Sequence, residues 1–386
     1  MSLIYLDNAA TSFPKPEETY AFMDEFYRSH GVNPGRSGYD LCMETGQLVD
    51  ETRKELTQFF NGTTPDRLIF AYNSTDALNL ALFGILAPGD HAITTAVEHN
   101  AVLRPLEHLA RGGGVEVDVV PFDAAGFVDP DDIARRFKPT TKVVALNHAS
   151  NVIGTVQPVA EIGRRCRERG IRLVVDASQT AGKIPIDVRA MNIDVLAFTG
   201  HKSLMGPTGI GGLCIQDDVV IRHTRAGGTG VRSAQRMHLD EYPWRLEYGT
   251  PNVMGIAGIH AGLSWIRKTG LAEIEAHEMR LLRRLADGLR EIPSVTLYCQ
   301  DSLADHIAVL IFNVDGLEAG NTGTMLDVDY NIACRTGLHC APRVHEQLGI
   351  DKIHGAVRLG IGPFNTDAHI ETAIGAVREI ASSRAR

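Results

Sequence analysis

Two residues with acid–base chemistry stand at the ends of neighbouring apolar segments. The segment 172–177 carries Asp176 near its end, and the segment 194–200 is followed at once by His201 and Lys202. In an open α/β sheet, ligands bind beyond the carboxyl ends of the strands. A lysine buried there loses its proton more readily and becomes a nucleophilic amine. Taken singly, Asp176 is more typical of a helix cap, and Lys202 of an ordinary exposed lysine at a strand end.

Together the two residues match the needs of pyridoxal 5′-phosphate (PLP). This cofactor needs a lysine for covalent attachment and a carboxylate that keeps its pyridine nitrogen protonated, so that the ring acts as an electron sink. Ser74 and Thr75 follow the apolar segment 67–72 and open a helical pattern. Hydroxyls and free N–H groups at a helix start can bind its phosphate, although they also suit a plain helix cap. His99 is placed to stack on the ring, unless it is a structural histidine.

The elements that must position these residues alternate along the first two-thirds of the chain. Several of the apolar segments are apolar on both faces, as parallel strands covered by helices must be. Helical patterns lie between them, for example at 75–86 and 159–169. This alternation of strand and helix patterns predicts a doubly wound α/β domain. The predicted strands are 67–72, 91–97, 115–122, 143–148, 172–177 and 194–200.

The pattern changes after Asn252, where an α+β arrangement is predicted. The helical patterns are 253–268, 271–292 and 366–382, and the strand-like segments are 295–298, 308–314, 332–335 and 357–361. We therefore expect a large domain over residues 15–252 and a smaller α+β domain formed by residues 1–14 and 253–386. The absence of a Pro/Ser-rich linker suggests that the two are packed closely together.

Composition narrows the class of protein. The chain has 386 residues, of which 44% are hydrophobic, and a formal net charge of −9. The absence of a basic face argues against nucleic acid as a partner. No apolar stretch has the length of a membrane span, and the N-terminus lacks the features of a secretion signal, so a cytoplasmic location is expected. The six cysteines are scattered without a C-x-x-C pair, which argues against a disulfide framework or a metal site.

Nine motifs in order along nearly the whole chain give a more specific indication. The sequence resembles fold-type I PLP enzymes of the class V aminotransferase group, specifically group II cysteine desulfurases, which are close to selenocysteine lyases. The motifs are Tyr5–Thr11 (YLDNAAT), 74–79 (STDALN), 98–100 (EHN), 147–155 (NHASNVIGT), 176–179 (DASQ), 199–202 (TGHK), 249–252 (GTPN), 335–340 (RTGLHC) and Arg358.

The resemblance implies a role for each matching residue around PLP. Lys202 would bond the cofactor and move protons, Asp176 would pair with the pyridine nitrogen, and Gln179 with the phenolic oxygen. His99 would stack on the ring and count among the catalytic residues. The implied phosphate ligands are Ser74, Thr75, Thr199 and His201. Thr250 would reach the phosphate of a second subunit, which implies a homodimer with shared active sites.

The resemblance also implies a substrate and a nucleophile. Arg358 would hold the carboxylate of L-cysteine by a bidentate fork, helped by Asn151. Cys340 lies in a short polar loop, where Arg335 and His339 would favour the thiolate by their positive charge. Without the resemblance, such a cysteine would be read as a spectator. With it, Cys340 would take the substrate sulfur as a persulfide, L-alanine would leave, and an unidentified acceptor would receive the sulfur, in sulfur metabolism such as iron–sulfur cluster biogenesis.

Three positions depart from the family pattern and keep other activities open. Many relatives carry Ser and Tyr where this chain has Gly360 and Phe364, which puts substrate size and affinity in doubt. Leu338 replaces a second histidine and removes a candidate acid or base beside Cys340. The alternatives are selenocysteine lyase, another class V reaction (transamination, epimerisation or β-elimination), and a non-enzymatic scaffold.

Overall fold

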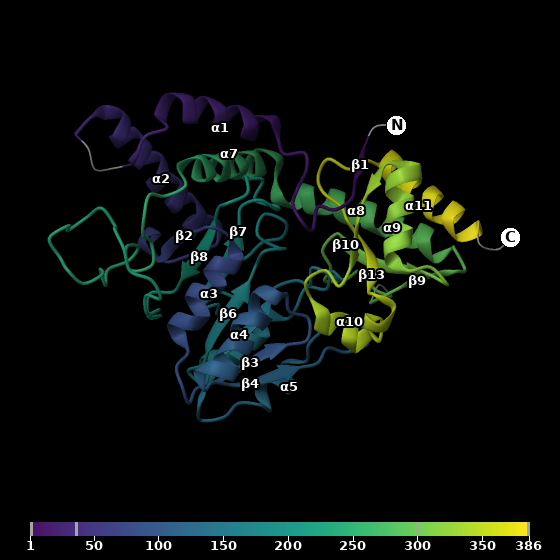
Figure 1. Cartoon of the computed structure of the whole chain (residues 1–386), viewed down its shortest axis with the longest axis horizontal. Coiled ribbons are helices and arrows are strands. Elements are labelled where there is room, and N and C mark those ends of the chain that lie inside the picture. Colours follow the sequence, from purple (N-terminus) through teal and green to yellow (C-terminus); the bar gives the residue numbers. More distant parts are fainter. Residues whose placement is uncertain (1–2, 35–37, 300, 384–386) are drawn as a thin grey trace.

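A seven-stranded sheet forms the centre of the molecule in the computed structural model, which describes residues 3–34, 38–299 and 301–383 (Figure 1). The strands that the sequence predicts as part of the large domain all belong to it. In spatial order the strands are β2 (Leu68–Ala71), β8 (Gly211–Ile215), β7 (Val195–Thr199), β6 (Arg172–Asp176), β5 (Thr141–Asn147), β3 (His91–Thr95) and β4 (Glu116–Val120).

Helices cover both faces of this sheet because its strands are apolar on both sides. In β7, Val195 and Ala197 join the hydrophobic cluster that contains α3 and α4, whereas Leu196 and Phe198 join the opposite cluster with α2, α6 and α7. The predicted α/β class is therefore confirmed. The bounds of these helices are Asp40–Phe59 (α2), Ser74–Ile85 (α3), Asn100–Gly113 (α4), Val159–Glu168 (α6) and Val253–Thr269 (α7).

One strand of the sheet was not predicted. β8 lies between β2 and β7 and runs antiparallel to both, so the six predicted strands keep a common direction. Its sequence begins with two glycines, which weaken the strand pattern. Packing requires them: a Cβ on Gly212 would lie 2.1 Å from the carbonyl oxygen of Ile69, and one on Gly211 would lie 2.5 Å from that of Phe198.

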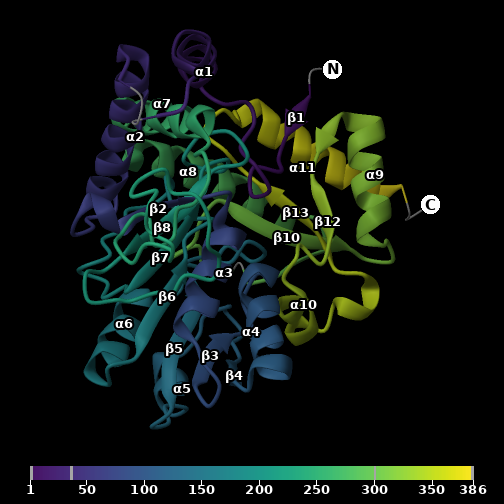
Figure 2. The same cartoon turned by 60° about the vertical axis from the view of Figure 1, so that its left-hand side comes forward.

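The C-terminal part forms a second, four-stranded sheet beside the first (Figure 2). Its order is β12 (Arg335–Gly337), β13 (Ala356–Gly360), β10 (Val309–Val314) and β9 (Val295–Leu297), all antiparallel. Four helices accompany it, namely α8 (Leu271–Arg290), α9 (Ala319–Tyr330), α10 (Pro342–Leu348) and α11 (Asp367–Ser382). This matches the α+β arrangement expected after Asn252, while the domain boundaries themselves stay a prediction.

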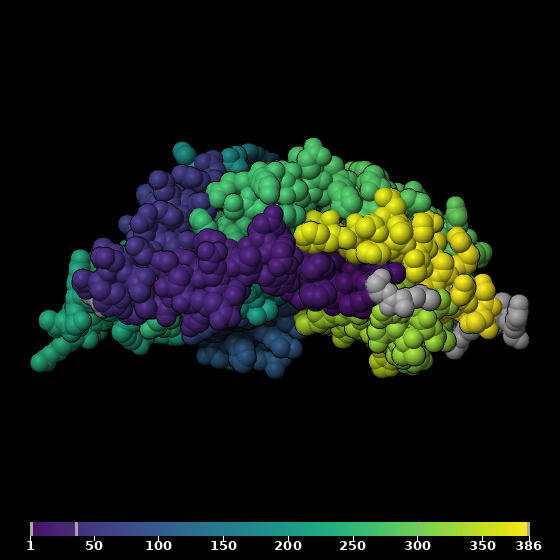
Figure 3. Space-filling model, turned by 90° about the horizontal axis from the view of Figure 1, so that it is seen from above, coloured from purple at the N-terminus to yellow at the C-terminus, as the bar shows by residue number. Residues whose placement is uncertain are grey.

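The N-terminal segment crosses the molecule and joins the C-terminal part. Strand β1 (Ile4–Tyr5) pairs in parallel with β11 (Ile332–Ala333), and Asp7 forms a bridge with Gly360. Helix α1 (Glu17–His30) then packs against α7 of the large sheet. Figure 3 shows these purple residues crossing one face of the molecule as far as the yellow C-terminal helix.

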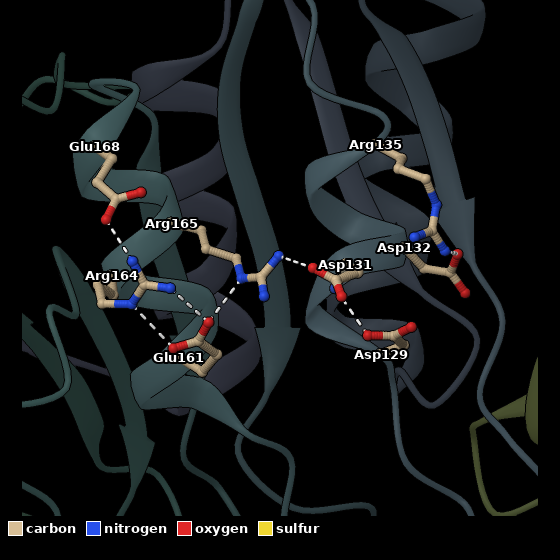
Figure 4. Close-up of polar contacts among 8 residues, drawn as sticks. All are labelled: Asp129, Asp131, Asp132, Arg135, Glu161, Arg164, Arg165 and Glu168. Carbon is tan, nitrogen blue, oxygen red and sulfur yellow. Dashed lines mark hydrogen bonds and ion pairs between the residues drawn. The ribbon is translucent and has the colours of Figure 1, made fainter.

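A network of exposed ion pairs joins helix α6 to the short helix α5 (Pro130–Ala134) (Figure 4). Glu161 accepts hydrogen bonds from Arg164 and Arg165 at 2.7 and 2.8 Å, and Arg165 also pairs with Asp131 on α5. Exposed pairs of this kind contribute at most about 1 kcal/mol each. Helix α6 is therefore held mainly by its apolar face.

A buried ion pair connects the two parts of the chain. Lys183, in the turn after β6, pairs with Glu278 on α8, and its Nζ also donates to the carbonyl oxygen of Ile361 at 3.3 Å. The side chains are only 7% and 3% exposed. The turn that follows Asp176 is thereby tied to the segment that follows Arg358.

Among the described residues, none of the helices combines the length and the apolar composition needed to cross a lipid bilayer.

Candidate active site

A cavity of about 280 Å³ lies beyond the carboxyl ends of three central strands. Asn147, Asp176 and Thr199 are the last residues of β5, β6 and β7, and all three line it. Parallel strands end at the same edge of a sheet, so these side chains converge although they are far apart in the sequence. Of the candidate site residues predicted from the sequence, all except Cys340 and Thr250 line this cavity. The lining candidates are Ser74, Thr75, His99, Asn151, Asp176, Gln179, Thr199, His201, Lys202 and Arg358.

Lys202 extends from the end of β7 into the cavity. Burial lowers the pKa of its ammonium group from 10.5 to about 8, although the nearby carboxylate of Asp176 opposes the shift. The guanidinium groups of Arg358 and Arg335 lower this pKa further. The unprotonated, nucleophilic form of the amine is therefore far more populated near neutral pH than in an ordinary lysine.

The carboxylate of Asp176 is held in a fixed orientation by two serines. Its Oδ1 accepts hydrogen bonds from Ser74 Oγ at 3.0 Å, from the Ser178 amide at 2.9 Å and from Ser178 Oγ at 2.5 Å. In the part of the chain that the structure describes, the hydrogen bonds to this side chain all reach Oδ1, so Oδ2 is left for a ligand. The Ser74 hydroxyl thus supports Asp176, and its expected contact with a phosphate stays a prediction. Ser178 was not recognised from the sequence as part of the site, although it lies inside the DASQ motif.

Several polar groups without partners belong to residues that line the cavity. Thr199 Oγ1 and His201 Nδ1 are buried and have no hydrogen-bond partner within residues 3–34, 38–299 and 301–383. Buried polar atoms in proteins are nearly always hydrogen-bonded. Helix α3 begins at Ser74, and Thr75 in its first turn also lines the cavity. A helix start and these unpartnered groups fit an anionic group with several acceptor oxygens.

His99 caps helix α4 and presents a neutral ring to the cavity. Its Nδ1 accepts a hydrogen bond from the Ala101 amide at 3.0 Å, so the neutral ring carries its proton on Nε2. Burial lowers the pKa of His99 to about 4, and the positive charge of Lys202 adds to the shift. A flat uncharged ring in this position suits stacking on an aromatic cofactor.

Arg358 lies in the middle of β13 and is 1% exposed. Its Nη2 donates to Asp7 Oδ1 at 2.7 Å and its Nη1 to the carbonyl oxygen of Asn151 at 3.0 Å, while Nε has no partner among the described residues. Asp7 was not recognised from the sequence as part of the site, although it belongs to the YLDNAAT motif. Arg358 and the cavity-lining Arg335 are direct cross-strand neighbours, so two guanidinium groups face this region.

Asn151 and Gln179 are partly engaged by the chain itself. The amide nitrogen of Asn151 donates to the carbonyl oxygen of His339 at 2.8 Å, and that of Gln179 donates to Ala9 O at 2.9 Å. Asn151 Oδ1 is buried and lacks a partner among the described residues. Asn151 therefore anchors the loop that precedes Cys340 in addition to lining the cavity.

Cys340 lies beside the cavity and contacts one of its walls. Arg335 Nη2 donates to Cys340 Sγ at 3.0 Å, and the carbonyl oxygen of Cys340 accepts from the Asn100 amide at 2.7 Å. Positive charge was expected there from both Arg335 and His339. For His339 this was wrong, because burial and the nearby Arg358 hold its pKa well below the usual value, so its ring is neutral. Arg335 supplies the cation at the sulfur.

Thr250 lies outside this cavity. It is exposed and lines a second, more open hollow of about 740 Å³ together with Tyr72 and Asp76. Residues 228–231 and 246–252 form part of its lining, and the segment between β8 and α7 to which they belong includes the loop that projects at the left of Figure 1. A contact of Thr250 with another subunit stays a prediction.

Gly360 and Phe364, the two residues near Arg358 that differ from many relatives, each contact another part of the chain closely. A Cβ on Gly360 would lie 2.8 Å from the amide nitrogen of Ala9, so the N-terminal segment leaves no room there for a side chain. The ring of Phe364 packs against Trp265, with 5.7 Å between centroids, and remains 38% exposed.

Comparisons with known proteins agree with one another. The family model described as Aminotransferase class-V matches residues 4–372. A probable cysteine desulfurase from Pyrococcus abyssi is 36% identical over 99% of this chain and 95% of its own length. The apo structure of cysteine desulfurase from Thermococcus onnurineus has a TM-score of 0.92 and 35% identity, over 99% of this chain and 95% of that one. The cysteine desulfurase CsdA from Escherichia coli has a TM-score of 0.88 and 29% identity, with the same coverage.

Proposed function

Because this chain belongs to the class V aminotransferase family, we propose that it is a PLP-dependent cysteine desulfurase that takes the substrate sulfur onto Cys340. The observation that carries the proposal is the contact between Arg335 and Cys340 Sγ at 3.0 Å, beside the cavity that holds Lys202 and Asp176. A cation at the sulfur stabilises the thiolate, which is the reactive form of a cysteine.

The residues of the cavity fit PLP. Lys202 would hold it covalently, Asp176 Oδ2 would face its pyridine nitrogen, and the ring of His99 would lie against it. Thr75, Thr199 and His201, which line the cavity, would bind its phosphate. When bound, PLP supplies an electron sink that stabilises negative charge at the substrate Cα.

The substrate is oriented by its carboxylate. Arg358 has an unpartnered Nε, and together with a second N–H it would bind the carboxylate of L-cysteine. Asp7 and the Asn151 carbonyl hold the guanidinium in place for this contact. Lys202 Nζ would then remove the proton from Cα.

The sulfur moves in one displacement. The Cys340 thiolate attacks the substrate Sγ and forms an S–S bond, while the Cβ–Sγ bond breaks. The electron pair of the broken bond remains on Cβ, which takes up a proton and becomes a methyl group, and Lys202 Nζ returns a proton to Cα to give L-alanine. The product on the protein is a Cys340 persulfide, which an acceptor thiol or protein must then remove. We further propose a homodimer, in which Thr250 contributes to the second subunit's site.

Replacing Cys340 with alanine is expected to lower alanine formation from L-cysteine by roughly 10²-fold or more, about 2.7 kcal/mol of transition-state stabilisation. The variant has no thiolate to attack Sγ, while the cavity around Lys202 is intact. Alanine and sulfide are measured with a reductant present. In the unmodified protein, brief incubation with L-cysteine should add the mass of one sulfur to the peptide containing Cys340.

Cys334→Ala is the matched control. Cys334 lies six residues earlier in the chain, but burial raises the pKa of its thiol to about 12, so it stays protonated and the variant should turn over normally. L-Selenocysteine gives a second comparison, because selenolate leaves more readily than sulfur and should be released by Cys340→Ala as well. Undiminished desulfuration by Cys340→Ala would make Cys340 a spectator and favour an eliminase or a transaminase.

A further inference from the structure

We propose that His345 is a positioning residue, which fixes the loop carrying Cys340 by donating a hydrogen bond to His339. The inference rests on the proposed role of Cys340 as the sulfur-accepting nucleophile. His345 lies on α10, outside the cavity, and sequence analysis gave it no role.

The two histidines form a buried pair behind the loop. His339 Nδ1 lies 3.2 Å from His345 Nε2, and His339 Nε2 lies 3.3 Å from the carbonyl oxygen of Arg335. The ring centroids are 5.3 Å apart, and the residues are 2% and 0% exposed. The pair therefore links α10 to β12, which carries the arginine in contact with Cys340.

These contacts determine where the protons lie. A carbonyl oxygen only accepts, so His339 must carry its proton on Nε2 to bond Arg335 O. In a neutral ring Nδ1 is then an acceptor, and His345 Nε2 must be the donor. Burial lowers the pKa of both rings, that of His345 to about 4, so the neutral forms are the relevant ones at physiological pH. His345 Nδ1 is left as an unprotonated buried acceptor, in agreement with its lack of a partner among the described residues.

The loop needs such support because its backbone is in an uncommon conformation. His339 and Cys340 have φ values of +50° and +58°, and Gly337 has +99°. Two successive side-chain-bearing residues in the left-handed region persist only where their surroundings hold them. Asn151 holds the carbonyl oxygen of His339 and Asn100 that of Cys340, while His345 holds the imidazole.

A consequence for the chemistry follows. Both ring nitrogens of His339 are engaged, so this histidine has no site free to exchange protons with the substrate. Its function is to keep the Sγ of Cys340 against Arg335. What His345 must supply is a single N–H donor at the position of its Nε2, which a glutamine can also supply and a leucine cannot.

The test compares His345→Gln with His345→Leu. We expect kcat for L-cysteine to fall by about 10-fold or more in His345→Leu with KM little changed, and to stay within about 2-fold in His345→Gln, since small displacements of a reacting group have large effects on rate. Alkylation of Cys340 by iodoacetamide without substrate, followed by peptide mass spectrometry, should show the same order. His108→Gln, at an exposed position on α4, is the control.

Equal losses in both His345 variants, or none in either, would overturn the proposal. The alkylation arm does not depend on turnover, so a chain that lacks desulfurase activity still tests the positioning role. If His345→Leu does not fold, 15N NMR of histidine-labelled unmodified protein decides the matter. A neutral His339 with its proton on Nε2 and a neutral His345 with its proton on Nε2 are expected, and any other pair of tautomers contradicts the inference.

Discussion

Replacing Lys202 with alanine is expected to abolish covalent attachment of PLP and to lower turnover of L-cysteine by roughly 10⁴-fold or more, about 5.4 kcal/mol. The lysine would provide both the amine that bonds the cofactor and the base at Cα, and no other lysine lines the cavity among the described residues. Borohydride reduction of the cofactor-loaded protein, followed by peptide mass spectrometry, should place PLP on Lys202 in the unmodified chain and on no lysine in the variant.

Lys15 provides a stringent control for this assignment. Burial lowers the pKa of its ammonium group to about 8 as well, and its Nζ donates to the carbonyl oxygen of His201 at 3.0 Å. If PLP attached to any lysine whose amine has a low pKa, reduction would also trap it on Lys15. Lys15→Ala should therefore retain covalent PLP on Lys202, and a reduced adduct on Lys15 would show the central assignment to be wrong.

The second large effect concerns stability. Lys183→Met is expected to lower the free energy of unfolding by about 3–5 kcal/mol, because it leaves the Glu278 carboxylate buried without its cation. Burial already raises the pKa of Glu278, which shows how poorly its surroundings solvate a negative charge. The change is measured as a lower midpoint of urea-induced unfolding.

Two further variants separate the cost of leaving Glu278 unpaired from the loss of any ion pair that involves α8. Lys183→Met combined with Glu278→Leu removes both charges and should recover most of the stability. Arg280→Met breaks the exposed pair with Asp367, whose side chains are 52% and 45% exposed, and should change the free energy of unfolding by about 0.5 kcal/mol or less. A Lys183→Met variant as stable as the parent would mean that water solvates Glu278.

The sequence predicted those site residues whose position follows from the secondary structure immediately around them. Asp176 and Thr199 were expected at strand ends, and the structure brings them together because β6 and β7 run in parallel. The short apolar segments that carry them have one stable arrangement, with helices on both faces. β8 was missed because its two glycines have no strand pattern of their own and are explained only by close packing against β2 and β7.

Contacts between distant side chains were not predictable in the same way. Arg358 and Asp7 are 351 residues apart, and nothing near either residue indicates the other. The roles of Ser74 and Asn151 were also incomplete, because a hydroxyl or an amide that lines a site can serve either a ligand or a neighbouring residue. Only the structure shows that Ser74 bonds Asp176 and that Asn151 bonds the loop before Cys340.

Arg335 and Arg358 lie directly across from each other on adjacent strands, and their mutual repulsion couples ligand binding to the folding equilibrium. Like charges directly across an antiparallel pair repel each other, and burial lowers the pKa of Arg358, with Arg335 adding to the shift. The substrate carboxylate that we propose to bind Arg358 would offset part of that repulsion and would bind only the folded chain. By mass action the fraction of folded protein would then rise with the concentration of carboxylate ligand, so the substrate would also stabilise the protein against heat.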